Sequence, residues 1–170
     1  MAVRPIRLLG DPVLRQRAKR VPQIDASIQR LIDDMIDSMR EASGVGLAAP
    51  QIGVPLRVIV IEVPDEEVVA LVNPEIVKRS GQRRLDEGCL SIPGYRAEVS
   101  RSLSVVVKGM DRQGRPVRIK AKDDLLAHAL EHEIDHINGV LYIDHLEGLE
   151  ELIRIEPEPG EEEEEVTAGL

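Results

Sequence analysis

The stretch DDLLAHALEHEIDHING, residues 123–139, predicts one amphipathic helix around which the rest of the chain is arranged. Asp123 or Asp124 can cap its start, because an aspartate oxygen accepts hydrogen bonds from the first free backbone N–H groups. Asn138 and Gly139 provide a left-handed stop at the other end. No residue between these caps breaks a helix.

Two histidines of this helix are spaced to share a metal ion. His132 and His136 lie only ~40° apart around the axis, so their imidazoles project side by side. Glu133 lies ~100° from His132, too far for a natural third ligand but close enough to reach a water molecule at the metal. A chance pair of histidines is the alternative, and the glutamate in the required slot makes the metal site the better interpretation. The motif alone does not name a reaction.

The remaining positions of the helix fall into three sectors. An apolar stripe should face the core, and it consists of Leu126, Leu130, Ile134 and Ile137. A polar stripe should face solvent or polar partners, and it consists of Asp124, Glu131 and Asp135. The third sector lies on the side of the two histidines and should line the cavity into which the metal opens; its residues are Leu125, His128 and Ala129.

Composition predicts one cytoplasmic domain. A chain of 170 residues can bury one proper core, and with two Tyr and no Phe or Trp that core must be mainly aliphatic. There is no run of 18 apolar residues and no signal-peptide pattern, so we expect no membrane partner. The single cysteine, Cys89, cannot form an internal disulfide, which suits a reducing cytoplasm.

The net charge of −9 is concentrated at the end of the chain. Residues 156–170 contain seven glutamates and no basic residue, so the remainder carries −2, the difference between −9 and −7. A body this close to neutral gives no electrostatic case for nucleic-acid binding. We therefore expect a single catalytic metalloenzyme domain over residues 1–155 and an acidic, disordered tail over residues 156–170.

The pattern of helices and strands indicates an α+β fold. Residues 26–42 repeat apolar side chains at helical spacing, and residues 56–84 and 97–120 are rich in β-branched residues. No parallel β-α-β alternation appears. We expect antiparallel or mixed β-sheets packed around a central metal-binding HExxH helix, with the helices on one side of the sheets.

Shorter segments carry weaker signals. Prolines in residues 1–24 predict an irregular entry segment. Residues 111–114, DRQG, predict a hairpin turn. After the metal helix we expect a short extended piece at 140–143 and a short final helix at 146–155.

The segment SGVGLAAPQ, residues 43–51, has two glycines two positions apart. This spacing is typical of a backbone that another group approaches closely. A phosphate-binding loop would need G-x-G-x-x-G or a Gly-Lys-Ser/Thr ending, and neither is present, so nucleotide binding has little support.

Cys89 lies in the segment DEGCLSIPG, residues 86–94, between the two β-rich regions. A lone cysteine is usually a small buried apolar residue. A catalytic metal held by two histidines, however, wants a third ligand and an open position. The Cys89 thiolate, flanked by Gly88 and by a turn at Pro93 and Gly94, could be presented on a loop at the rim of a sheet.

Three segments taken together resemble the signature motifs of the peptide deformylase family. They are GVGLAAPQ at 44–51, EGCLS at 87–91 and HEIDH at 132–136, in the family order. The resemblance extends from about residue 11 to about residue 146. It implies an enzyme that removes the formyl group from formyl-methionyl nascent polypeptides emerging from the ribosome, releasing formate and a free N-terminal methionine.

The resemblance also implies roles for particular residues. It makes Cys89, His132 and His136 the metal ligands and Glu133 the general acid and base. It makes Gln51 and the backbone N–H of Leu90 the hydrogen-bond donors to the formyl oxygen. It implies one divalent ion per chain, commonly Fe²⁺ in the cell, with Zn²⁺, Ni²⁺ or Co²⁺ as substitutes, among which thiolate and imidazole ligands do not choose.

The methionine pocket implied by the resemblance lies beside the metal helix. Val45, Gly46, Leu85 and Glu87 would complete the lining that Leu125, His128 and Ala129 begin. His128 is more polar than expected at its position, and Glu131 replaces the usual glutamine. These two departures bear on side-chain preference.

Two other interpretations compete with this one. A zinc endopeptidase shares His-Glu-x-x-His, but Tyr142 stands where one branch has a third histidine, and another branch would need Glu147, Glu150 or Glu151 as third ligand. A structural metal knot or binding module would need a closed site with four ligands. Cys89 in its motif argues against the endopeptidase, and the three evident ligands argue against the knot.

Overall fold

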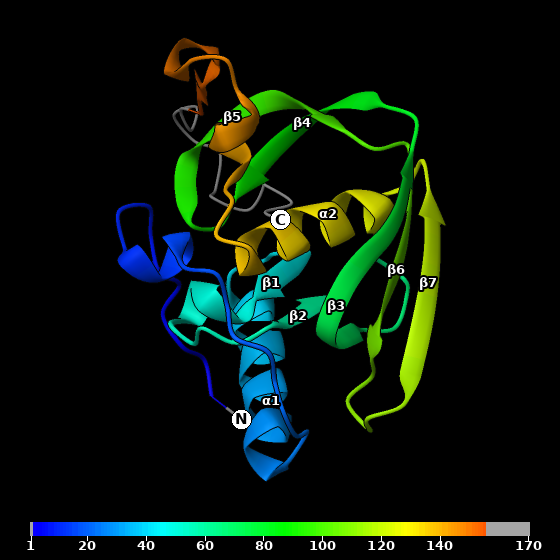
Figure 1. Ribbon diagram of the computed structural model, residues 1–170. Coiled ribbons are helices and arrows are strands. Elements are labelled where there is room, and N and C mark those ends of the chain that lie inside the picture. Colours follow the sequence, from blue (N-terminus) through cyan, green and yellow to red (C-terminus); the bar gives the residue numbers. More distant parts are fainter. Residues whose placement is uncertain (1, 156–170) are drawn as a thin grey trace.

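The computed structural model describes residues 2–155 and shows an α+β fold with two α-helices and antiparallel sheets (Figure 1). The acidic tail predicted at residues 156–170 lies outside the described residues. Every pairing between the strands of residues 2–155 is antiparallel, and one isolated parallel bridge joins Lys19 to Leu56 outside these strands. The fold class is therefore confirmed in its antiparallel form.

Two sheets make up the β structure. The five-stranded sheet has the order β1-β2-β3-β6-β7, with β1 Gly46–Ala48, β2 Val58–Ile61, β3 Val69–Ser80, β6 Ser104–Met110 and β7 Pro116–Lys122. The three-stranded sheet has the order β4-β5-β8, with β4 Arg83–Cys89, β5 Ile92–Arg101 and β8 Ile153–Arg154. The predicted hairpin joins β6 to β7, where Asp111 Oδ1 accepts the backbone N–H groups of Gln113 and Arg115.

The two helices, α1 (Ala26–Glu41) and α2 (Leu125–Ile137), pack on opposite faces of the five-stranded sheet. The sequence of β2 explains this arrangement. Val58 and Val60 belong to the core around α1, whereas Ile59 and Ile61 belong to the core under α2. A strand that is apolar at every position is buried on both faces. The expectation of helices on one side was wrong for this reason.

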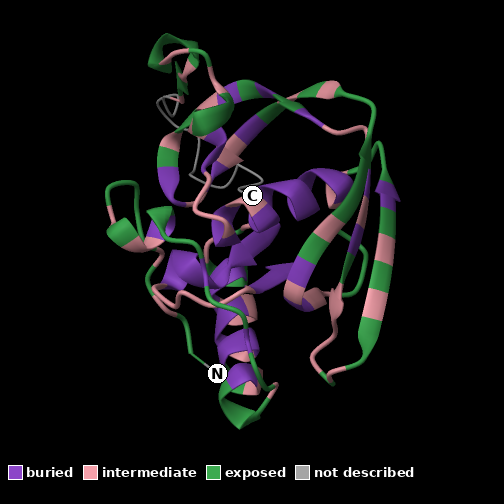
Figure 2. Ribbon diagram, in the orientation of Figure 1, coloured by how far each residue is buried: buried purple, intermediate pink, exposed green. Residues whose placement is uncertain are grey.

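Helix α2 lies between the two sheets (Figures 1 and 2). Leu130, Ile134 and Ile137 are buried against the five-stranded sheet, with Leu126 half-buried beside them. The opposite side of α2 faces β4 and β5, whose side chains bond to the polar residues of the helix. The helix on which the sequence analysis is centred is therefore the middle layer of the molecule.

The predicted caps of α2 are present. Asp124 Oδ1 accepts the backbone N–H of Ala127 at 2.8 Å, so Asp124 is the N-cap. Gly139 has a φ of 78°, and a Cβ there would lie 2.7 Å from the carbonyl oxygen of Arg15. This position therefore needs glycine both for its conformation and for the space.

The segment after α2 differs from the prediction. Residues 140–143 do not form an extended piece, because Asp144 accepts the backbone N–H of Leu141 and closes the short 3-10 helix Tyr142–His145. Residues 146–155 do not form an α-helix either. They form the 3-10 turn Leu149–Glu151 and then β8, which pairs with the edge of β5. A nearby strand edge outweighs the weak helical pattern of these residues.

The predictions for the entry segment and for the segment around Cys89 had different outcomes. The entry segment is irregular, with one 3-10 turn at Pro12–Arg15. Cys89, expected on a loop at the rim of a sheet, is instead the last residue of strand β4, and β5 begins at Ile92.

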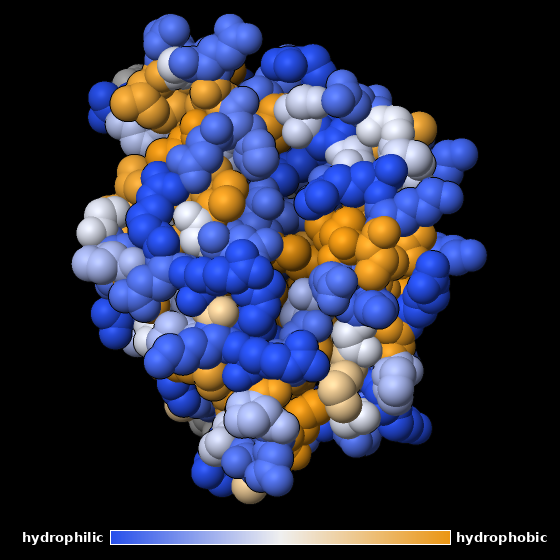
Figure 3. All heavy atoms as spheres, in the orientation of Figure 1, coloured by the Kyte–Doolittle hydropathy of each residue, from blue (hydrophilic) through white to orange (hydrophobic). Residues whose placement is uncertain are grey.

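The surface shows no continuous apolar band on the face seen in the space-filling view, where hydrophilic side chains separate several hydrophobic patches (Figure 3). None of the helices in residues 2–155 is both long and apolar enough to cross a membrane. The large exposed apolar side chains are Val3, Leu8, Leu9, Val77, Tyr95, Leu149 and Ile153.

Candidate active site

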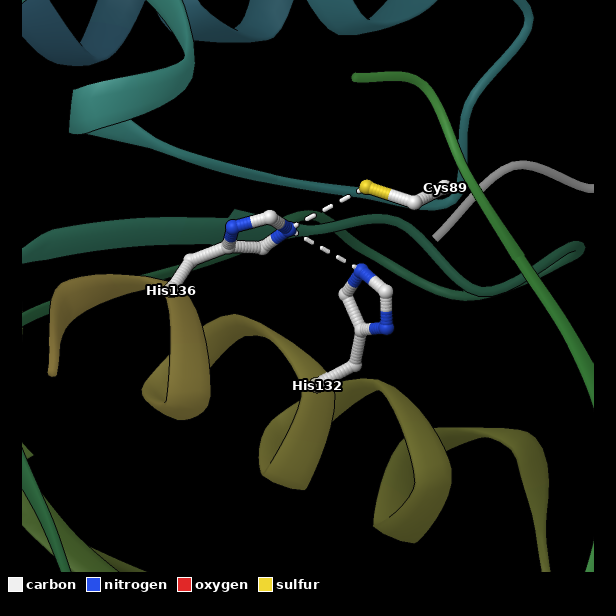
Figure 4. A group of neighbouring side chains, drawn as sticks. All are labelled: Cys89, His132 and His136. Atoms are coloured by element: carbon white, nitrogen blue, oxygen red, sulfur yellow. Dashed lines mark hydrogen bonds between the residues drawn. The ribbon is translucent and has the colours of Figure 1, made fainter. Parts of the chain in front are cut away.

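Cys89, at the end of β4, meets His132 and His136 of α2 (Figure 4). Cys89 Sγ lies 3.3 Å from His136 Nε2, which lies 3.1 Å from His132 Nε2. All three ligand atoms are within 4.8 Å of one another, and all three residues are buried. Three donors that surround one ion at about 2.0–2.3 Å have separations of this kind.

The protonation chemistry of these donors fits a divalent cation. Burial, together with the neighbouring His132, holds the pKa of His136 well below its ordinary value, so its imidazole is in the neutral form that binds metals. Burial raises the pKa of the Cys89 thiol. A bound cation reverses that effect, because it stabilises the thiolate directly. One sulfur and two nitrogen ligands leave a fourth position open.

Glu87 of β4 holds His132 from behind. Glu87 Oε2 lies 2.7 Å from His132 Nδ1, and Oε1 lies 2.6 Å from His128 Nε2. Arg101 donates to both oxygens, at 2.9 and 2.7 Å. These four contacts use all the acceptor sites of the carboxylate, because an ionised carboxylate accepts about four hydrogen bonds. Because Nδ1 of His132 donates to Glu87, its Nε2 carries the lone pair that faces Cys89 and His136.

The charge state of Glu87 follows from the same contacts. Burial by itself would raise the pKa of Glu87, but His132, His128 and Arg101 outweigh it and hold the pKa well below its ordinary value. The carboxylate is therefore ionised and acts only as an acceptor.

Arg101 was missed by the sequence analysis. Its side chain is almost fully buried, and it also donates to Asp135 of α2 at 2.7 Å. The signal for it was the alternation along β5, in which Ala97, Val99 and Arg101 all point inward. A charged residue in an inward position needs buried partners.

Glu133 is the second buried carboxylate of the site. Neither of its oxygens has a hydrogen-bond partner within residues 2–155, and Oε1 lies 4.0 Å from His136 Nε2. Burial and the charge of Glu87 raise its pKa well above the ordinary value. A Cβ on Gly46 would lie 2.6 Å from Glu133 Oε2. The close approach predicted for the glycine segment is therefore found, and the approaching group is this carboxylate.

Gln51 lies beside the thiol. Its Oε1 accepts the backbone N–H of Ala48 at 3.0 Å, and its Nε2 donates to Ser91 Oγ at 3.1 Å and points to Cys89 Sγ at 3.7 Å. Leu90 is half-buried in the turn that directly follows Cys89. Ser91, which the sequence analysis did not single out, also donates its backbone N–H to Cys89 Sγ at 3.4 Å.

The residues expected to line a methionine pocket have diverse surroundings. Val45 and Ala129 belong to one buried apolar cluster, against which Leu125 packs, and Leu85 is half-buried on β4. His128 and Glu87 are bonded to each other. The polar character of His128 is explained by this partner.

Glu131 has a separate role. It accepts the backbone N–H and the hydroxyl of Ser102 at 2.7 and 3.1 Å, joining α2 to the turn between β5 and β6. The glutamates considered as third ligands of an endopeptidase, Glu147, Glu150 and Glu151, are exposed and do not belong to the Cys89 cluster.

The similarity to known proteins extends over nearly the whole chain. The family model for polypeptide deformylase matches residues 3–151. A peptide deformylase of Dehalococcoides mccartyi (strain CBDB1) is 55% identical over 159 residues, which is 93% of this chain and 95% of that protein. A peptide deformylase of Thermomicrobium roseum is 48% identical and covers 99% of this chain and 98% of its own length.

Solved structures agree with these sequences. The crystal structure of a peptide deformylase from Legionella pneumophila superposes with a TM-score of 0.85 at 49% identity, over 88% of this chain and 89% of that one. A peptide deformylase from Synechococcus elongatus in complex with actinonin gives a TM-score of 0.82 at 44% identity, over 86% and 80% of the two chains.

Proposed function

This chain belongs to the polypeptide deformylase family, and we propose from that membership how its residues carry out the reaction. The enzyme is a hydrolase that removes the N-terminal formyl group from nascent polypeptides, releasing formate and a free N-terminal methionine. The observation that supports the mechanism is the convergence of three ligand atoms beside a buried carboxylate that has no partner within residues 2–155.

Cys89, His132 and His136 would hold one divalent metal ion. When bound, such an ion lowers the pKa of a coordinated water and polarises a carbonyl. We assign Fe²⁺ as the ion in the cell, with Zn²⁺, Ni²⁺ or Co²⁺ as substitutes. A mixed thiolate and imidazole set accepts all of these.

Glu133 acts as the proton carrier. Its carboxylate takes a proton from the attacking water and later delivers it to the leaving amine nitrogen. Its raised pKa suits both steps, because the group must accept a proton and release it near neutral pH. The absence of competing hydrogen bonds within residues 2–155 leaves both oxygens available for this transfer.

Gln51 Nε2 and the backbone N–H of Leu90 stabilise the charge that develops on the formyl oxygen. The Oε1 contact with Ala48 fixes the orientation of the Gln51 amide, so that its NH₂ group faces Cys89. Donors that are already oriented need no rearrangement in the transition state, and losing one typically costs on the order of 3 kcal/mol.

The methionine side chain would be received beside α2. Val45, Gly46, Leu85, Leu125 and Ala129 are the lining that we propose. Glu87 and His128 would support this wall from behind, because their polar atoms are engaged with each other. The substrates are formyl-methionyl chains emerging from the ribosome in the cytoplasm.

The test is an assay for formate release from formyl-Met-Ala-Ser by anaerobically purified protein of known metal content. Glu133→Gln should retain the metal and lose about 10²–10⁴-fold in rate. Its melting temperature should not fall, because the change removes an unpaired buried carboxylate. Glu131→Gln, on the same helix but bonded to Ser102, is the matched control and should retain its rate. Wild-type turnover by Glu133→Gln would refute the assignment.

A further inference from the structure

An unbroken line of ionic contacts runs from the proposed metal site to the surface. Glu87, which holds His132 Nδ1, receives two bonds from Arg101. The third nitrogen of Arg101, Nη1, donates to Asp135 Oδ2 at 2.7 Å. His145 Nε2 lies 2.8 Å from the same Oδ2. Asp135 and His145 have no place in the mechanism proposed above.

Burial decreases steadily along this line. The side chains of Glu87 and Arg101 are 0% and 3% exposed, whereas those of Asp135 and His145 are 16% and 36% exposed. The outer end opens into a surface hollow that Arg79, Gln82 and Ser100 also line. The inner members therefore depend on fixed protein partners, because water cannot replace a lost bond there.

The contacts of Glu87 and Arg101 form a closed ring that joins helix α2 to the sheet above it. His132 and Asp135 both lie on α2, Glu87 lies on β4 and Arg101 on β5. The ring therefore fastens α2 to the β4–β5 hairpin at two points. Cys89 is on that hairpin and the histidines are on α2, so the same fastening sets the separation of the three ligand atoms.

The orientation of the Arg101 side chain in this ring depends on its hydrogen-bond partners. Its guanidinium is planar, and its two sides are occupied by Glu87 and Asp135. Two partners in fixed directions hold the plane in one orientation, as a single carboxylate would not. Asp135 in turn is held by His145 from the short helix that follows α2.

We propose that Asp135 and His145 are positioning residues for the metal site, which they stabilise by orienting Arg101 and through it the Glu87 carboxylate on His132. This inference rests on the proposed function, since it assumes that Cys89, His132 and His136 bind a metal ion. Asp135 is three contacts away from the ligand His132 and His145 is four contacts away, through Glu87 and Arg101.

The experiment compares Asp135→Asn and His145→Ala with Glu131→Gln in the full-length chain loaded with Zn²⁺. Glu131 is the matched control, because it is a buried carboxylate of the same helix without a hydrogen bond to Arg101 or Glu87. The first measurement is the zinc dissociation constant, from competition with a chelator. The second is the NMR signal of the His132 Nδ1 proton in protein labelled with ¹⁵N-histidine.

Asp135→Asn should weaken zinc binding by about tenfold, the lower end of the range for outer partners of metal ligands. His145→Ala should weaken it less, and both should broaden the Nδ1 proton signal. Asp135→Glu and His145→Lys keep a carboxylate and a cationic donor, so they should restore most of the affinity. Glu131→Gln should leave both measurements unchanged.

Four results would count against the proposal. A lower melting temperature for Asp135→Asn with unchanged affinity and Nδ1 signal would show a purely structural role. Equal losses in Asp135→Asn and Glu131→Gln would show a general effect of charge removal. If Asp135→Asn does not fold, His145→Ala at the exposed end decides the matter alone. A wild-type chain that binds no zinc would overturn the proposed function as well, whereas equal binding by wild type and both variants would overturn only this inference.

Discussion

Gly46 of β1 lies against the carboxylate of Glu133 so closely that a Cβ would come within 2.6 Å of Oε2 and 3.0 Å of Cδ. The absence of a side chain at Gly46 thus leaves the space that Glu133, the proposed proton carrier, occupies. Gly46→Ala should displace Glu133 and lower kcat at least tenfold while metal content stays unchanged. Overpacking should also cost about 1–3 kcal/mol of unfolding free energy. Rate assays, metal analysis and urea denaturation test these expectations.

A double-mutant cycle controls this prediction. If the clash is with Glu133, Gly46→Ala should destabilise the Glu133→Ala variant much less than it destabilises the wild type. Equal costs in both backgrounds would show that the added methyl group meets something other than this carboxylate.

Cys89→Ser should weaken metal retention and shift the preference toward harder ions, because a hydroxyl replaces a soft anionic ligand. Metal analysis after dialysis against a chelator measures the first effect, and competition between Zn²⁺ and Mn²⁺ measures the second. Ser91→Ala, which removes a hydroxyl from the same turn, is the control. Unchanged affinity in Cys89→Ser would mean that the cysteine only fills the core. Peroxide should inactivate the Fe²⁺ form of the wild type, since both iron and thiolate are oxidisable.

Acid should remove a contribution to stability made by Asp34 of α1. Burial alone would raise the pKa of Asp34, but hydrogen bonds from the Arg4 guanidinium and the backbone N–H of Ala2 outweigh it and hold the pKa below its ordinary value. A group with a lowered pKa in the folded state stabilises the protein above its unfolded pKa of about 3.9 and loses this effect as the pH falls further. The stability difference between wild type and Asp34→Asn should therefore be largest near pH 7 and narrow below about pH 4.

Urea denaturation between pH 7 and pH 3 measures this difference. Asp37 belongs to the same helix, and its side chain makes no hydrogen bond or ion pair within residues 2–155, so the stability difference between wild type and Asp37→Asn should change little with pH. A difference between wild type and Asp34→Asn that stays constant down to pH 3 would contradict the prediction.

Deletion of residues 156–170 should leave formate release and melting temperature close to those of the full chain. Their sequence has too little apolar surface to pack on a core, and we expect residues 1–155 to be the complete catalytic domain. The deletion removes seven negative charges and should raise the isoelectric point. Replacing the five glutamates at 161–165 with glutamine separates charge from length. A large fall in melting temperature on truncation would assign the tail a structural role.

The helix that carries the histidines could be predicted because its signals are local. Capping residues, helical spacing and the His132–Glu133–His136 pattern all lie within 17 residues. The pairing of β6 with β7 was predictable for the same reason, since DRQG and its flanking strands form one continuous segment. The approach of a group to Gly46 could be predicted, but not which group approaches.

The sequence could not predict which residues of distant segments contact one another. Nothing near Arg101 in the chain shows that Glu87 and Asp135 will lie on its two sides. His128 was expected beside the histidine ligands, and only the fold shows that it bonds to Glu87. The placement of α1 and α2 on opposite faces was signalled by the uninterrupted apolar run of β2, yet the run does not say which helix covers which face.

The alternation along β4 makes the site sensitive to chain length. Glu87 and Cys89 are buried while Asp86 is exposed, so residues two apart face α2. The pairing of β4 with β5 keeps one register from Arg83 to Glu87 and shifts between Glu87 and Cys89. Inserting or deleting one residue within the regular part would exchange the inward and outward positions and carry the Glu87 carboxylate away from the histidines. The hairpin at residues 111–114 can lengthen without moving any residue of the site. Insertions that arise during evolution should therefore survive at that hairpin and be eliminated at residues 83–87.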